Sequence, residues 1–217
     1  MNYSQLAFSD AVKELQQKFG SRHIYERVEK YHVVDGLTAN KKKFIAEQDH
    51  FYLATIGENG YPYIQHRGGS KGIVKVLNDE TLAFVDFSGN RQYISVGNIE
   101  TNPQVALIMV SYPHRARLKV YAQAKVVSLT DEPELFAQID PADYKHRPER
   151  ILVLTVQAYD WNCPQHITPR YTAEELEPAF AAQRQRLADM EAKNEKLTAE
   201  LEKLKKQPND HDLLPSG

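Results

Sequence analysis

Apolar and polar residues alternate in two pairs of short segments in the first half of the chain. Residues 51–57 and 61–67 flank Glu58-Asn59-Gly60, whose Asn-Gly pair is the strongest short signal for the positive φ angles of a type I′ turn. Residues 72–78 and 81–87 flank a second short polar turn in the same way. The pattern predicts two consecutive β-hairpins.

Three longer apolar segments follow at residues 104–112, 117–129 and 151–162. Apolar residues occupy both alternating sets of positions from Val105 to Val110, so we expect this strand to be buried on both faces, as in a barrel core. Six or seven strands with hairpin connections predict a mainly β fold with flanking helices. An antiparallel barrel fits this pattern better than a doubly wound parallel sheet.

Helical spacing covers much of the first 50 residues. Apolar residues recur at that spacing from Phe8 to Phe19, with Ser9 as the expected N-cap and Gly20 after the end. Residues 22–35 are polar with scattered aromatic side chains, and both a short helix and a loop are compatible with this composition. Thr38 then has the position of an N-cap for a helix that runs to about Gln48.

Two further segments connect the predicted strands. Residues 89–101 carry spaced apolar side chains and end before Asn102-Pro103, which predicts a short crossing helix. The acidic residues 131–138 form a short excursion between two strands.

A heptad repeat marks the last part of the chain. Its members recur at alternating steps of three and four, with Glu and Lys between them: Leu176, Phe180, Gln183, Leu187, Met190, Asn194, Leu197, Leu201 and Leu204. An amphipathic helix lying on its own barrel would show the same spacing, but the charged outer positions favour a two-stranded coil. Asn194 would then occupy an a position, where a buried amide pair favours parallel dimers. We expect residues 208–217 to be disordered.

The composition limits the classes of function. The 217 residues are 41% apolar, which is enough for an ordinary core. A formal net charge of −2 provides no global attraction for nucleic acid or an anionic membrane, so phosphate recognition would have to be local. The chain shows no long apolar run and no secretion signal, and its one cysteine, Cys163, fits a reducing compartment, so we expect a cytoplasmic protein.

Familiar nucleotide and hydrolase motifs are missing from the sequence. No Gly-x-Gly-x-x-Gly follows a predicted strand, and the chain has neither a Walker lysine nor a catalytic serine elbow. Three polar groups remain as candidate sites.

The first group is the glycine-containing bend at residues 65–72. Its glycines would let the backbone approach a ligand closely, and Arg67 and Lys71 bring positive charge. A hairpin loop with solvated cations explains the same residues equally well.

The second group is Ser88-Gly89-Asn90-Arg91-Gln92, followed by Ser95. If a helix begins near Asn90, its free N–H groups, the Arg91 guanidinium and the Ser95 hydroxyl could converge on one phosphate. A simple capping turn is the alternative, but a cap has no need of Arg91.

The third group lies in residues 161–170, which contain the only Trp and the only Cys of the chain. Cys163 and His166 supply just two soft metal ligands, so we expect no zinc site. A nucleophilic Cys–His pair remains open, although neighbours in sequence need not have the required geometry. The aromatic and hydrogen-bonding content suits the wall of a pocket for a planar ligand.

Four motifs combine in one order: YIQHRGGSKG, DFSGNRQYISVGNIETNP, LIMV and WNCPQHITPR. Together they resemble the pyridoxamine 5′-phosphate oxidase-related FMN-binding family, over about Phe44 to Arg170. The resemblance implies a split β-barrel that dimerises and holds FMN at the subunit interface. Together with the helical and heptad patterns, it divides the chain into four parts: N-terminal covering helices in 1–50, the split-barrel FMN-binding domain in 51–171, a C-terminal heptad helix in 172–207, and the tail in 208–217.

The resemblance further implies a set of site residues. The isoalloxazine edge and ribityl chain would contact Gln65, His66, Arg67, Gly68, Gly69 and Ser70, with Val85 and Asp86 along the ribityl region. The phosphate would be held by Asn90, Arg91, Gln92 and Ser95. Trp161, Gln165 and His166 would complete the flavin site of the other subunit. Arg67 or Lys71 would stabilise reduced anionic flavin. His166 is the candidate proton donor or substrate contact, and a structural hydrogen bond that holds its loop is the alternative.

One departure from true pyridoxamine phosphate oxidases changes the expected reaction. Those enzymes end in a basic Arg-x-His type segment that binds the substrate phosphate, whereas in this chain the heptad helix follows Pro169-Arg170-Tyr171. We therefore predict a homodimeric FMN-dependent oxidoreductase acting on another small molecule, with NAD(P)H as a candidate electron donor and without nucleic-acid or membrane partners. A non-catalytic flavin sensor or store, and a haem-binding or haem-degrading split barrel, remain as alternatives.

Overall fold

The computed structural model describes residues 2–31, 36–161 and 164–206. The chain divides into two compact units, Met1–Pro169 and Arg170–Gly217, and each is described by itself. Among the described residues, every helix is too short or too polar to cross a membrane.

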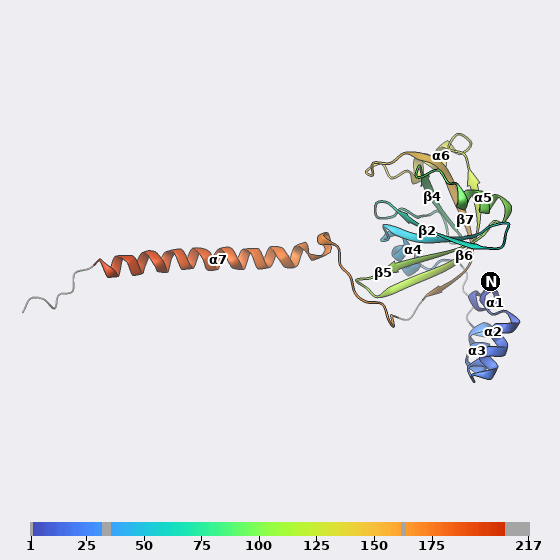
Figure 1. Cartoon of the computed structure of the whole chain (residues 1–217), viewed down its shortest axis with the longest axis horizontal. Coiled ribbons are helices and arrows are strands. Elements are labelled where there is room, and N and C mark those ends of the chain that lie inside the picture. The colour runs from blue at the N-terminus through green and yellow to red at the C-terminus, as the bar shows by residue number, and fades with distance from the viewer. Residues whose placement is uncertain (1, 32–35, 162–163, 207–217) are drawn as a thin grey trace, which may run out of the picture. The chain divides into compact units, whose positions relative to one another are not determined.

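One seven-stranded sheet dominates the first unit (Figure 1). Its strands are β1 (His50–Ile56), β2 (Pro62–Gly68), β3 (Lys75–Val76), β4 (Thr81–Phe87), β5 (Gln104–Ser111), β6 (Ala116–Val127) and β7 (Pro148–Trp161). Their order across the sheet is β2-β1-β5-β6-β7-β4-β3, with antiparallel neighbours throughout. The predicted hairpins and the mainly β fold with flanking helices are confirmed. The sheet is open between β2 and β3, as a split barrel requires.

The first hairpin closes with a different turn from the one predicted. Gly60 has a φ of +79°, whereas Asn59 does not enter the left-handed region, so the turn is not type I′. The Gly57 N–H donates to the Tyr61 carbonyl, and the Gly60 N–H donates to the Gly57 carbonyl. A three-residue loop with a left-handed glycine at its end therefore joins β1 to β2.

Burial on both faces occurs in β4 rather than in β5. The odd-numbered β5 residues from Val105 to Met109 are buried, but the alternating set is only half-buried, so the prediction for β5 is wrong for this chain. The β4 residues Leu82–Asp86 are all buried. One face of β4 lies on the main core, and Ala83 and Val85 on its other face pack with Ile139 of α6 (Pro133–Ile139).

Three helices form a small group before the barrel (Figure 1): α1 (Tyr3–Ala7), α2 (Asp10–Lys18) and α3 (Arg22–Tyr31). The helix predicted after Ser9 is confirmed, and the segment left open between helix and loop is helical as far as Tyr31. The Asn2 side chain joins α1 to α3 by donating to the carbonyls of Val28 and Glu29. The predicted helix after Thr38 is α4 (Ala39–Ala46).

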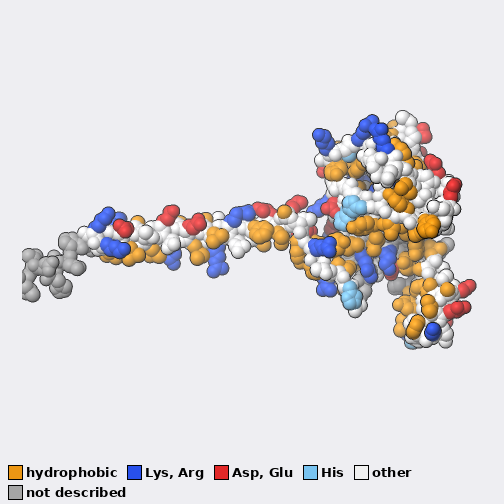
Figure 2. Space-filling model, in the orientation of Figure 1, with side chains coloured by type: hydrophobic (Ala, Val, Ile, Leu, Met, Phe, Trp, Pro, Cys, Tyr) orange, Lys and Arg blue, Asp and Glu red, His pale blue; other side chains and the backbone are white. Residues whose placement is uncertain are grey.

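The second unit consists of the helix α7 (Ala173–Lys205). Thr172 forms a capping box with Glu175, which fixes the start of the helix. Figure 2 shows apolar side chains gathered along one side of α7, with charged side chains beside them. The long helix predicted from the heptad pattern is confirmed, whereas its pairing stays a prediction. The tail predicted to be disordered lies outside the described residues.

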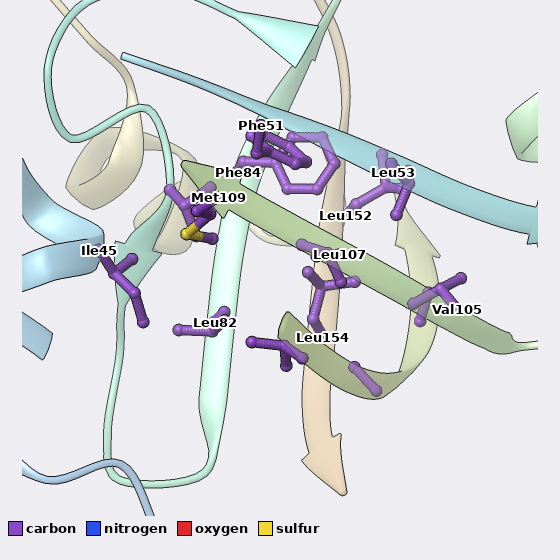
Figure 3. Close-up of a cluster of buried hydrophobic side chains, with 14 of the residues drawn as sticks. Ile45, Phe51, Leu53, Leu82, Phe84, Val105, Leu107, Met109, Leu152 and Leu154 are labelled. Atoms are coloured by element: carbon purple, nitrogen blue, oxygen red, sulfur yellow. The ribbon is translucent and has the colours of Figure 1, made fainter. Parts of the chain in front are cut away.

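Figure 3 shows the buried side chains of the main core. Side chains from β1, β4, β5 and β7 meet there with Ile45 from α4, and the fully buried members include Phe51, Leu53, Leu82, Met109 and Leu152. Phe51 and Phe84 pack edge to face, with ring centroids 4.9 Å apart. This core fixes β1 and β4 in place, and with them the ends of the sheet that form the candidate site.

Candidate functional site

A cleft lies where β2 approaches β4 across the opening of the sheet. On β2, Gln65 and Arg67 are the cross-strand partners of the buried residues Leu53 and Phe51. Cross-strand partners point to the same face of a sheet, so both side chains point inward toward β4. His66, between them, points to the opposite face, where it stacks on His50.

An ion pair closes the bottom of the cleft. Arg67 of β2 donates to the Asp86 carboxylate on β4, and the Asp86 residue is only 5% exposed. Arg150 of β7 lies on the other side, with its Nε 3.7 Å from Asp86 Oδ2. Burial raises the pKa of Asp86 above its ordinary value, and the two guanidinium groups oppose that rise. Asp86 therefore positions both arginines beside the cleft.

A β-bulge brings a second carboxylate to this region. Asp86 pairs with Arg150 and Phe87 pairs with Pro148, so Glu149 is the extra residue on β7. Its side chain accepts from Arg150 at 2.6 Å and also lines the cleft. Bulges often redirect a side chain at a functional site, and this one adds an acid that the sequence motifs did not indicate.

The segment between β4 and α5 (Ile94–Thr101) has an unusual backbone. Arg91 and Tyr93 have φ angles of +59° and +57°, a region that non-glycine residues rarely occupy. The Asn90 amide bonds to the Gln92 side chain at 3.0 Å and accepts from the Gln92 N–H at 3.3 Å. The Arg150 guanidinium lies 5.0 Å from the centre of the Tyr93 ring. These contacts hold residues 90–93 against the edge of the cleft.

The helix α5 begins at Ile94, four residues later than the start expected near Asn90. Its first turn still faces the cleft, because Ile94, Ser95 and Val96 all line it. The buried Ser95 hydroxyl donates to Gln65 Oε1 at 2.9 Å, which joins α5 to β2. The later start leaves Arg91 on the loop before the helix, and in the described part of the chain Arg91 has no acidic partner.

The cleft brings together seven of the site residues predicted from sequence: Gln65, Arg67, Asp86, Asn90, Arg91, Gln92 and Ser95. Its other lining residues include Tyr63, Phe87 and Glu149. The enclosed volume is about 50 Å³, whereas a pocket for a drug-sized ligand has roughly 300–1,000 Å³. One chain therefore provides a polar surface with two guanidinium groups and a helix N-terminus, and it does not enclose a large ligand.

Residues 37–162 match the sequence model of the family described as pyridoxamine 5′-phosphate oxidase. The chain belongs to the pyridoxamine 5′-phosphate oxidase family. The match covers all seven strands, so the open antiparallel sheet is the split barrel of this family. No curated protein matches the chain.

Several solved structures are similar to this family member at low sequence identity. An FMN-binding protein from Syntrophomonas wolfei is 12% identical, with 68% of this chain and 97% of that chain covered and a TM-score of 0.45. HupZ of Group A Streptococcus is 14% identical, with 62% and 100% covered and a TM-score of 0.45. HutZ, the haem storage protein from Vibrio cholerae, is 21% identical, with 58% and 94% covered and a TM-score of 0.37. Because these structures are only distantly similar, the assignment to the family rests on the match of residues 37–162 to the sequence model of the family.

Several predicted residues of this family member lie outside the cleft. Val85 is buried against α6 on the far face of β4, because neighbours in a strand point to opposite sides. Lys71 is exposed on the loop after β2. The Gly69 and Gly72 N–H groups donate to the carbonyls of Asp49 and Gln48, so the chain itself uses these donors. His66, Gly68, Gly69 and Ser70 are also absent from the cleft lining of the single chain.

The loop after β7, as far as the structure describes it, does not line the cleft of its own chain. Arg115, in the turn between β5 and β6, donates to the carbonyls of Pro164 and Ile167, which ties this loop to that turn. Trp161 packs edge to face on Phe44 and lies beneath the Lys41 ammonium, 4.0 Å from the ring centre. Gln165 and His166 are exposed. A role for this loop at a flavin thus needs a second subunit, and Cys163 lies outside the described residues.

The residues at or beside the cleft that were not predicted from sequence include Tyr63, Tyr93, Glu149 and Arg150. Tyr63 stands two residues before Gln65, so the strand period alone would have placed it on the same face. Glu149 and Arg150 carry no such signal, because their position depends on the pairing of β7 with β4 and on the bulge.

Proposed function

We propose that this chain is an FMN-binding flavoprotein that acts, as a homodimer, as an oxidoreductase on a small molecule. Membership of the pyridoxamine 5′-phosphate oxidase family supports the proposal at the level of fold. The observation that carries it is the convergence of Arg91, the first turn of α5 and Arg67 on one cleft.

The residues at the edge of the cleft fit a phosphate group. The first N–H groups of α5 have no partner inside the helix and point toward an anion placed at its N-terminus. Arg91, which lacks an acidic partner in the described residues, adds a full positive charge beside them. We infer that Arg91, the N–H groups of residues 94–96 and the side chains of Asn90 and Gln92 hold the FMN phosphate.

The inner part of the cleft fits the polar edge of a flavin ring system. Arg67 Nε is buried and has no hydrogen-bond partner among the described residues, although its terminal nitrogen is committed to Asp86. A buried donor without a partner costs free energy that a ligand acceptor would recover. We infer that Arg67 donates to the ring or ribityl oxygens, while Gln65 is held in place by Ser95.

The small volume of the cleft supports a dimeric site. A cleft with a volume of about 50 Å³ leaves most of a three-ring ligand exposed, so a second chain is needed to cover it. Apolar side chains lie on and next to the edge strand β2, where Ile64 is 66% exposed and Tyr61 is 75% exposed. We propose that the barrels pair through this side of the sheet, and that Trp161, Gln165 and His166 of one chain reach the flavin of the other.

FMN, when bound, supplies the ring that accepts and donates electrons or hydride. The residues of the chain then exclude water from the ring, orient it and provide positive charge near it. Arg67 is oriented by Asp86 and Arg150 by Glu149, so the charges beside the ring are fixed before the cofactor binds. The exposed His166 keeps its proposed role as a proton donor from the second subunit.

Comparing FMN with riboflavin tests the phosphate assignment. The two flavins differ only by the phosphate, so the full-length chain should bind FMN more tightly than riboflavin. Arg91→Ala should weaken FMN binding about 10- to 100-fold, as expected for the loss of a charge-assisted contact, and leave riboflavin binding unchanged. Lys125→Ala removes the same charge from an exposed site on β6 and should alter neither affinity. Affinities would be measured from the quenching of flavin fluorescence.

The outcomes separate the candidate functions. Equal loss of FMN and riboflavin binding in Arg91→Ala would contradict the phosphate role, and a failure to bind either flavin would sink the flavoprotein proposal. Bleaching of the bound flavin by NADH or NADPH without oxygen supports a reductase, whereas a flavin that stays oxidised indicates a store or sensor. A red protein with a Soret band would move the assignment to haem binding.

A further inference from the structure

The apolar face of α7 is exposed along its whole length. None of the residues of this helix is buried, and the side chains on its apolar face are roughly half exposed or more (Figure 2): Phe180 46%, Leu187 54%, Met190 60%, Leu197 48%, Leu201 56% and Leu204 63%. An exposed apolar stripe of this length marks a surface that binds another apolar surface.

The spacing of the stripe identifies the kind of partner. The a positions are Phe180, Leu187, Asn194 and Leu201, and the d positions are Gln183, Met190, Leu197 and Leu204. A seven-residue repeat kept over more than three heptads matches another helix with the same repeat, because knobs at a and d fill holes on the facing helix. A second copy of this chain carries the same repeat in the same register, so we infer that it supplies the helix that covers the stripe.

The charges beside the stripe favour a parallel pair. The e positions are Arg184, Glu191, Thr198 and Lys205, and the g positions are Ala179, Arg186, Lys193 and Glu200. In a parallel coil each g side chain faces the e side chain five residues later on the other helix. Arg186 then faces the partner's Glu191, and Glu200 faces the partner's Lys205. The other two combinations join a charged residue to an uncharged one, so no like charges meet.

These four charged side chains are available for pairing between chains. Within the described part of the chain, none of Arg186, Glu191, Glu200 and Lys205 takes part in an ion pair. Arg184, by contrast, already pairs with Glu177 on its own helix. The four charged residues that the parallel arrangement needs are thus free of ion pairs within the single helix.

An antiparallel pair fits less well. Residues at a would then face residues at d, and the register that best matches polar side chains places Asn194 opposite the partner's Gln183. That register brings Arg186 beside the partner's Lys193, which is a like-charge contact. Registers that avoid it place the Asn194 amide against Met190 or Leu197, where its hydrogen-bonding groups have no polar partner.

We propose that α7 forms a parallel, two-stranded coiled coil with a second copy of this chain over residues 180–205. An Asn194 pair in the core and the contacts of Arg186 with Glu191 and of Glu200 with Lys205 set its orientation and register. Each of these charged contacts occurs twice in the symmetric pair. Because a parallel coil joins the two chains at the same end, it raises the effective concentration of one barrel for the other. This inference rests on α7 and is independent of FMN binding.

A distance measurement between spin labels tests the orientation. Ala199 is an outward-facing f position, and Ala199→Cys in the full-length chain with Cys163→Ser gives one label per chain. In a parallel coil the two labels lie at the same height, about 20–30 Å apart. In the antiparallel register that places Asn194 opposite the partner's Gln183, the labels are offset by about 32 Å along the axis, at 1.5 Å per residue, which gives about 40 Å in total. The longer distance, or the lack of any defined distance, overturns the proposal.

Charge reversal tests the pairing residues. Arg186→Glu with Glu200→Lys leaves the net charge unchanged but turns the four attractive contacts into like-charge contacts. We expect the association constant of the helices to fall about 100-fold, with loss of the short distance at matched concentration. Mixing this variant with a chain carrying Glu191→Arg and Lys205→Glu makes every contact attractive again and should restore the distance.

The control reverses charges on the outer face. Lys196→Glu with Glu202→Lys also leaves the net charge unchanged, and both positions point away from the partner helix in the coil. The short distance should persist in this variant. Loss of the distance in the control, retention of it after the reversal at positions 186 and 200, or no recovery in the mixture would each overturn the proposed contacts.

Discussion

The buried ion pair of Arg67 and Asp86 should respond to pH in opposite ways when one partner or the other is removed. Asp86 is 5% exposed and the Arg67 side chain 13%, so both charges are largely removed from water. Removing one member of such a pair leaves an uncompensated buried charge, which costs about 3–5 kcal/mol in the free energy of unfolding.

Asp86→Ala leaves the Arg67 guanidinium without its carboxylate. The guanidinium cannot lose its proton at any ordinary pH, so the cost of about 3–5 kcal/mol persists at pH 4 and at pH 7. Burial raises the pKa of Asp86 in the wild-type chain, and acid therefore favours the folded wild type through this group. The stability deficit of the Asp86→Ala variant should not shrink as the pH falls.

Arg67→Met leaves a carboxylate that can neutralise itself by binding a proton. From an ordinary pKa of 3.8, protonation costs about 4 kcal/mol at pH 7 and about 0.6 kcal/mol at pH 4, which sets the upper limit of the penalty at each pH. Because the pKa of Asp86 is raised in the folded state, the contribution of this carboxyl group to the free energy of unfolding is fully present below pH 3.8. That contribution is lost as the pH rises through the pKa of Asp86 in the folded state. Arg150, at 3.7 Å from Asp86, keeps the penalty below the limit.

Urea unfolding followed by circular dichroism at pH 4 and pH 7 measures both deficits against the wild type at the same pH and protein concentration. The deficit of Arg67→Met should be much smaller at pH 4, and that of Asp86→Ala should not. The double variant Arg67→Met with Asp86→Leu removes both charges and should be closer to the wild type than either single variant. Equal deficits of Arg67→Met at the two pH values would show that the carboxylate is not desolvated, and the reasoning would fail.

Two further substitutions have defined outcomes. Gly36 has a φ of +66°, and a Cβ there would lie 2.7 Å from Asp79 Cβ, so Gly36→Ala should lower the free energy of unfolding by at least about 2 kcal/mol. Gly60→Ala is its control, because Gly60 has a φ of +79° with nothing within 4 Å, and it should cost only the backbone strain of about 1–2 kcal/mol. Ser95→Ala removes the 2.9 Å hydrogen bond to Gln65 at a site 2% exposed, which should cost about 1–2 kcal/mol in thermal or urea unfolding and weaken FMN binding without abolishing it. An unchanged stability of Ser95→Ala would show that this contact does not join α5 to β2.

The local elements were predictable because their signals are local. Alternation of apolar residues located the strands, and Ser9 and Thr38 marked helix starts that the structure contains. The start of α5 was misplaced because a serine-glycine-asparagine sequence resembles a cap, whereas the left-handed Arg91 and Tyr93 delay the helix to Ile94. Residues 82–85 of β4 form a continuous apolar run, which is the same signal for burial on both faces that we assigned to β5, and α6 covers the second face of β4.

The candidate site was predictable only in part, because side-chain direction in a strand is decided by a single residue of register. The motif at residues 65–71 marked the right segment, but the alternation sends Gln65 and Arg67 toward β4 and His66 away from it. The buried partners Phe51 and Leu53 define the inner face of the hairpin, so this choice follows once β1 and β2 are aligned. Alignment in turn depends on the loop of three residues, and a two-residue turn at Asn59-Gly60 would shift it by one residue.

Glu149 and Arg150 could not be found from sequence, because their side-chain directions also depend on how strands pair. Their place beside Asp86 requires the pairing of two strands that are more than 60 residues apart, with an extra residue at the bulge. Without the bulge, residues before Arg150 would keep a strict alternation, and Glu149 would point away from Asp86. The bulge places two carboxylates and two guanidinium groups around one opening of the barrel. Such a balance of charge suits a ligand that carries its own negative group at one end. Arg67 and Arg150 pair with carboxylates, whereas Arg91 at the edge of the cleft has no acidic partner within the described residues.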